Sequence, residues 1–77
     1  MTNNEIKELR RSKGLTQKQL AELLQCDVFS VRRYEADESK PYASKPRAIY
    51  AKVLDRIQAG ELDGEIDKLK NKKLSNK

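Results

Sequence analysis

Arg32 and Arg33 are adjacent in the segment Asp27–Ala36, and their side chains could recognise an anionic partner specifically. A guanidinium presents five N–H donors in a fixed fork, which fits a phosphate or the O6 and N7 acceptors of guanine. At 100° per residue of helix, Val31 and Tyr34 share one side of the segment, and the two arginines fall on the other. Such a helix can be held by its apolar side while its cationic side enters a DNA groove.

Catalytic and metal chemistry are poorly supported by the composition. The chain has no histidine, which is the commonest general base and metal ligand. Cys26 is its only cysteine, so the usual four-ligand structural zinc site is excluded. The three glycines are dispersed and form no loop that could cradle a phosphate. We therefore expect no enzyme, no metal site and no cofactor.

The length of the chain indicates one small domain, and its charge is net positive. The 77 residues carry a net charge of +5, and residues 65–77 hold five lysines against Glu65 and Asp67. A basic balance attracts polyanions, but it also serves solubility. We expect a domain over residues 1–60, followed over residues 61–77 by a short helix and a basic tail. That tail could solubilise the chain or add nonspecific DNA affinity.

A cytoplasmic location is expected. No apolar run approaches the ~20 residues that a membrane helix needs, so no membrane partner is expected. The start of the chain lacks the basic-then-apolar pattern of a signal peptide. A single cysteine fits a reducing compartment.

The first half of the chain predicts three short helices. Thr2 with Glu5, and Thr16 with Gln19, have the spacing of capping boxes, which predicts helices from about Asn4 and from Gln17. Glycine 14 ends the first helix. Asp27 is the expected N-cap of a third helix over residues 28–36.

The second half predicts a loop and one or two helices, which gives an all-α bundle of four or five helices. Residues 37–45 are polar, and the Tyr34–Tyr42 stretch could include a short extended segment. Pro46 suits the first turn of a helix reaching about Ala59, with Ser44 or Lys45 as its cap. Apolar positions 49, 53, 54 and 57 support that helix, and positions 62, 66, 69 and 74 a weaker fifth one.

The second and third segments meet the physical needs of a helix-turn-helix. A small residue must let the two helix backbones approach, and Ala21 supplies it. The turn needs a small apolar plug, which suits Cys26. The third segment needs inward anchors three residues apart, and Val31 and Tyr34 provide them.

Four fragments resemble the Cro/C1-type (XRE) helix-turn-helix regulators, which have a lambda-repressor-like fold. They are Ile6–Arg10, Gly14–Gln17, Leu20–Leu24 and Val31–Glu35, and the likeness extends over residues 5–59. The short length is also similar to that of small phage regulators. Three departures from the family pattern are Gln25 in place of the turn glycine, Ala36-Asp37 in place of an Arg-Gly or Ser-Gly exit, and a longer, more polar loop over residues 37–45.

The resemblance implies a sequence-specific regulator of transcription that binds double-stranded DNA and acts as a repressor on a palindromic operator. It assigns base contacts to Val28, Phe29, Ser30, Arg32 and Arg33. It assigns phosphate contacts to Gln17, Lys18, Lys40, Tyr42, Lys45 and Arg47. Because arginine reads guanine and apolar groups pack on thymine methyls, we expect a half-site that pairs a guanine with neighbouring thymines.

A homodimer is expected, because one such helix reads only ~3–4 base pairs. Its expected interface is formed by Ile57, Leu62, Ile66 and Leu69, of which the last three could instead complete the core of one chain. Two other functions stay open: a DNA-binding antitoxin that also holds a protein partner, and a protein-binding adaptor built on the same fold.

Several assigned residues have a simpler alternative. Arg32 and Arg33 could be solvated or paired with Glu35 or Asp37. Phe29 could bury against the fourth helix. Gln17, with Thr16, could do nothing beyond capping, and Tyr42 could be a packing residue.

Overall fold

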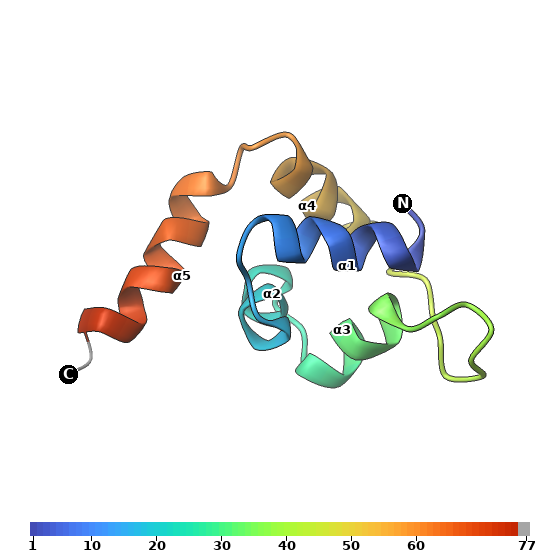
Figure 1. Cartoon of the computed structure of the whole chain (residues 1–77). Coiled ribbons are helices and arrows are strands. Elements are labelled where there is room, and N and C mark those ends of the chain that lie inside the picture. The colour runs from blue at the N-terminus through green and yellow to red at the C-terminus, as the bar shows by residue number, and fades with distance from the viewer. Residues whose placement is uncertain (76–77) are drawn as a thin grey trace.

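The structure is a computed structural model that describes residues 1–75, with side chains as far as residue 71. In these residues it is all-α, as predicted, with five helices and no strand (Figure 1). The helices are α1 (Asn3–Ser12), α2 (Gln17–Leu24), α3 (Val28–Glu35), α4 (Ala48–Gln58) and α5 (Asp63–Ser75).

Both predicted capping boxes are present and set the starts of α1 and α2. The Thr2 hydroxyl accepts from the Glu5 N–H at 3.1 Å, and Glu5 Oε1 accepts from the Thr2 N–H at 2.7 Å. Thr16 and Gln19 repeat this pair at 3.0 and 2.9 Å. Each box satisfies two N–H groups that the first turn of a helix leaves unpaired.

Helices α1, α2 and α4 end through a residue in the left-handed backbone conformation. These residues are Gly14 (φ 70°), Gln25 (φ 60°) and Gly60 (φ 81°). In each case the next residue donates its N–H back to the last turn of the helix, as Cys26 does to the Ala21 carbonyl at 3.0 Å. This is the Schellman arrangement. The turn between α2 and α3 therefore keeps its geometry although Gln25 replaces the glycine usual in the family.

The start of α4 differs from the prediction. The helix begins at Ala48 with Arg47 as its N-cap, not with Pro46 in its first turn and Ser44 or Lys45 as the cap. The Ser44 N–H is bonded to the Arg33 carbonyl at 3.1 Å, which keeps this residue in the loop beside α3. Arg47 is extended and makes no side-chain cap bond. The extended segment expected over residues 34–42 is also absent, since the chain there continues α3 and then forms turns.

One core joins all five helices. Its buried members are Ile6, Leu15, Leu20, Ala21, Leu24, Val31, Tyr34, Leu54, Ile57 and Ile66. Helix α5 enters the core through Ile66 and then projects away from the other four helices (Figure 1). In α4 the inward side is marked by Tyr50, whose ring centre lies 6.1 Å from that of Tyr34, while Ile49 is 66% exposed.

The core position of two isoleucines corrects the expected dimer interface. Ile57 is 0% exposed and Ile66 is 3% exposed within a single chain, so neither side chain is available to a second copy. The sequence could not decide this, because an apolar stripe looks the same whether its partner is the same chain or another. Leu62 and Leu69 are half-buried.

Within residues 1–75, no helix combines the length and the apolar character needed to cross a membrane.

Candidate DNA-binding surface

Helix α3 is fixed from its inner side, as the sequence predicted. Val31 is 0% exposed and Tyr34 is 8% exposed. At its start, Asp27 Oδ1 accepts from the Ser30 N–H at 2.7 Å. That hydrogen bond is the main reason why the pKa of the Asp27 carboxyl lies below its usual value. The helix is therefore capped at its first turn and packed against the core along its apolar side.

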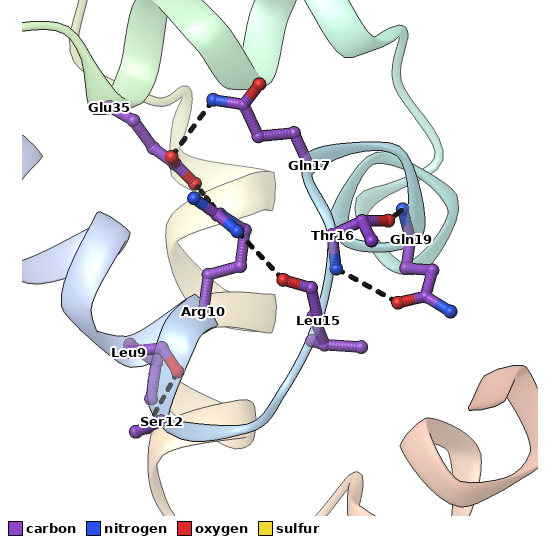
Figure 2. Close-up of polar contacts among 8 residues, drawn as sticks. All are labelled: Leu9, Arg10, Ser12, Leu15, Thr16, Gln17, Gln19 and Glu35. Carbon is purple, nitrogen blue, oxygen red and sulfur yellow. Dashed lines mark hydrogen bonds and ion pairs between the residues drawn. The ribbon is translucent and has the colours of Figure 1, made fainter.

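A buried ion pair ties α3 to α1 and α2 (Figure 2). Arg10 Nε donates to Glu35 Oε2 at 2.7 Å, and Gln17 Nε2 donates to Glu35 Oε1 at 3.2 Å. Arg10 Nη1 also donates to the Leu15 carbonyl at 2.8 Å. The Glu35 side chain is 2% exposed, and electrostatic hydrogen bonds are stronger in such a low-dielectric setting. This network fixes the rotation of α3 relative to the two preceding helices.

The outer side of α3 carries the two arginines. Arg32 and Arg33 are exposed, and Glu35 pairs with Arg10 instead of with either of them. Phe29 is 64% exposed, so it does not bury against α4. The Arg32 guanidinium carbon lies 5.4 Å from the centre of the Phe29 ring, a cation–π arrangement that holds both side chains outward. The other assigned base-contacting residues, Val28 and Ser30, are half-buried.

A hollow of about 340 Å³ lies beside this outer side. It is lined by Lys7, Gln17, Arg32, Glu35, Ala36 and Tyr42. Three residues that the sequence analysis assigned to DNA, Gln17, Arg32 and Tyr42, therefore meet at one place. Lys7 also lines the hollow, and no role was assigned to it from the sequence. Its spacing of three residues before Arg10 could have indicated it, since such positions share a side of a helix.

Gln17 has a partner that the sequence did not indicate. Its amide is engaged with Glu35, so its side chain does more than cap α2. A phosphate at this point would lie near the positive dipole end of α2. There it could accept from the Gln17 and Lys18 N–H groups, which the Thr16–Gln19 capping box does not use.

The remaining cations that the sequence assigned to phosphates do not line the hollow. They are all exposed: Lys18, Lys40, Lys45 and Arg47. Tyr42 is 56% exposed, so it is not a packing residue of the core. Lys18 lies on α2, whereas the other residues lie between α3 and α4. In that loop the Asp37 carboxylate accepts from the Ser39 N–H at 2.9 Å. That bond lowers the pKa of the Asp37 carboxyl.

The turn between α2 and α3 has the packing predicted for it. Ala21 is 4% exposed, and Cys26 is half-buried against the core. Burial, together with the nearby Asp27 carboxylate, raises the pKa of the Cys26 thiol. The thiol is therefore neutral near pH 7 and serves as an apolar plug.

The sequence profile of the helix-turn-helix family matches residues 6–43, which extend from α1 through α3 into the following loop. The chain belongs to the Cro/C1-type (XRE) helix-turn-helix family. It is a DNA-binding regulator of transcription, and its partner is double-stranded DNA. No curated protein and no solved structure is significantly similar to this regulator. Among its described residues, no group of His, Cys, Asp or Glu side chains is arranged to hold a metal ion.

Proposed function

We propose that this regulator is a repressor that binds a palindromic operator as a homodimer, with α3 in the major groove. The observation that carries the proposal is the orientation of α3 relative to the core. Val31, Tyr34 and Glu35 are buried on its inner side, while Arg32 and Arg33 project from the outer side with no carboxylate paired to them in the described residues. A rigid helix with outward guanidinium groups fits the width and the acceptor pattern of the major groove.

The proposed base readers differ in chemistry. Arg33 would take a guanine through its O6 and N7 atoms, a contact worth ~1–3 kcal/mol of discrimination. Arg32 would contact either a base edge or a phosphate. The same two contacts are open to Ser30. Phe29 and Val28 have only apolar surface to offer, which suits thymine methyl groups. The half-site would therefore pair a guanine with neighbouring thymines.

The proposed phosphate contacts come from residues that line the hollow and from exposed cations outside it. The hollow beside Lys7, Gln17, Arg32 and Tyr42 would take one phosphate, close to the start of α2. Further contacts would come from Lys18, Lys40, Lys45 and Arg47. These contacts set the orientation of the protein on the duplex without reading its sequence.

The proposed dimer would form along α4 and α5. Of the four residues expected there, Leu62 and Leu69 remain, and they line a groove of about 600 Å³ with Ile49 and Val53. The rim carries both charge signs, Glu22 and Glu65 against Arg56 and Lys68. A two-fold interface brings the same surface together twice, so a mixed rim can pair with itself. A change of Ile49→Glu is expected to lower the self-association seen by analytical ultracentrifugation, whereas Lys52→Glu is not.

Selection of bound fragments from random duplex DNA tests the function. Enrichment of two inverted half-sites about one helical turn apart, each with a guanine, is the expected result. Arg33→Ala is expected to remove the preference for that guanine, and the control Arg11→Ala on α1 is expected to keep it. No enrichment would contradict the proposal and favour an adaptor. A reporter with the enriched site over its promoter is expected to lose expression when the protein is present.

A further inference from the structure

Asn3 is a buried polar residue that the DNA-binding surface does not include. It is the first residue of α1 and only 2% exposed. Its Nδ2 atom donates to the Ala36 carbonyl at 2.9 Å and to the Arg33 carbonyl at 3.4 Å. The start of α1 is thus bonded directly to the end of α3.

These bonds replace an ordinary helix ending. Helix α3 stops at an extended Ala36 (φ −67°, ψ 146°), without the left-handed residue that ends α1, α2 and α4. The last carbonyls of a helix need donors from outside when no such residue follows. Asn3 supplies one to Ala36, and the Ser44 N–H supplies one to Arg33 at 3.1 Å.

The Oδ1 atom of the Asn3 amide indicates that the side chain contributes through its N–H donors. Its Oδ1 atom is buried and has no hydrogen-bond partner within the structure described. An unpaired buried acceptor destabilises the folded state, and an apolar side chain would avoid that loss. The Asn3 amide thus has an oxygen that destabilises the folded state. Its N–H groups are used by the Arg33 and Ala36 carbonyls at the end of α3.

Asn3 acts together with Arg10. The two residues are seven apart, which places them on the same side of α1. Arg10 holds the Glu35 carboxylate, and Asn3 holds the backbone on either side of it, at Arg33 and Ala36. The end of α3 is therefore fixed against α1 by both backbone and side-chain bonds.

We propose that Asn3 is a positioning residue for DNA recognition, which fixes the carboxyl end of α3 and so the direction in which Arg33 leaves it. The inference rests on the proposed function, in which Arg33 reads a base. A small rotation of this end would move the guanidinium off the guanine edge while leaving the charge of the surface unchanged. Sequence discrimination depends on Asn3, and nonspecific attraction to DNA does not.

The test compares Asn3→Ala with Asn4→Ala, an exposed neighbour on the same helix. The quantity measured is the ratio of affinities for the selected site and for a random duplex, at a temperature where circular dichroism shows every variant folded. Asn3→Ala is expected to lower this ratio about tenfold, with the salt dependence of random-duplex binding unchanged. Asn4→Ala is expected to keep the wild-type ratio. A purely structural role would lower the melting temperature and leave the ratio unchanged, and that result would overturn the proposal.

A second variant and a second measurement keep the outcomes distinct. If Asn3→Ala does not fold, Asn3→Leu also removes the whole amide but keeps a side chain of similar size at this buried position. The same loss of discrimination is expected from it. Amide hydrogen exchange at Tyr34–Ala36 is expected to quicken in the Asn3 variant and not in Asn4→Ala. If the wild-type protein does not discriminate between duplexes, the proposed function fails. In that case, unchanged amide exchange in the Asn3 variant would also overturn the idea that Asn3 fixes the end of α3. Faster exchange would retain that idea.

Discussion

Gln25 shows how one residue can preserve a motif at a cost in stability. Its backbone lies in the left-handed region at φ 60°, where a side chain crowds the following carbonyl. The family pattern has glycine at this point, and the Schellman bonds of the turn form here regardless. The sequence indicated the departure from the pattern. It could not indicate whether the turn would change shape or the residue would accept the strain.

Gln25→Gly is therefore expected to stabilise the protein. Relief of the left-handed strain outweighs the greater chain entropy of glycine in the unfolded state, for a net gain of about 0.5–1 kcal/mol. Urea unfolding followed by circular dichroism measures it. Gln25→Ala, which keeps a Cβ in the same conformation, should give no such gain. A glycine variant less stable than the wild type would show that the Gln25 side chain has a stabilising contact of its own.

The N-cap carboxylate of Asp27 makes the stability of α3 depend on pH. The bond from the Ser30 N–H lowers the pKa of the folded carboxyl below that of the unfolded chain. The carboxylate's stabilisation is then complete above the unfolded pKa and is lost as pH falls through the folded one. Asp27→Asn keeps a capping group that does not titrate.

Thermal unfolding between pH 7 and pH 2 should show the wild type more stable than Asp27→Asn at neutral pH. The difference should vanish under acid, because both caps are then neutral. Other acidic groups titrate in both proteins and cancel in the comparison. A difference that stays constant down to the lowest pH would show that the charge on the Asp27 cap is irrelevant.

At the scale of elements, features set by neighbouring residues could be predicted from the sequence. Features set by contacts between distant parts of the chain could not. Thr2, Thr16 and Asp27 predicted three helix starts, because a cap and its partner are only three residues apart. The start of α4 was predicted wrongly, because Ser44 is held by Arg33, a bond between two parts of the chain that no local pattern reveals. The inward side of α4 shows the same limit, since Tyr50 and not Ile49 packs toward the core.

The Arg10–Glu35 pair is a buried ionic contact that links α3 to α1. Arg10→Met should destabilise the fold by about 3–5 kcal/mol, because it leaves the buried Glu35 carboxylate without its countercharge. The double variant Arg10→Met, Glu35→Leu should recover much of that loss, because no unpaired charge remains in the interior. Urea unfolding of both single variants and the double variant measures the coupling. Additive losses would show that the two side chains act independently.

At the scale of the whole molecule, the outward cations lie on more than one side of the chain, and their expected roles differ. Lys45 and Arg47 come directly after Ser44, whose N–H is bonded to the Arg33 carbonyl near the end of α3. Lys68 lies on α5 at the rim of the α4–α5 groove, 3.9 Å from Glu65. Net charge alone could not separate these groups in the sequence. Their placement relative to α3 does, because under the proposed binding mode only groups near α3 would reach the phosphates of a duplex whose groove it enters.

The salt dependence of DNA binding tests this division of the surface. Each phosphate contact releases counterions and contributes about 0.9 to the slope of log affinity against log salt. In a homodimer each substitution occurs twice, so Lys45→Gln or Arg47→Gln should reduce the slope by about 1.8. Lys68→Gln, with the same change of charge, should leave the slope unchanged. An equal effect of all three substitutions would mean that DNA responds only to the total charge, and a reduction of about 0.9 would indicate a single chain on the duplex.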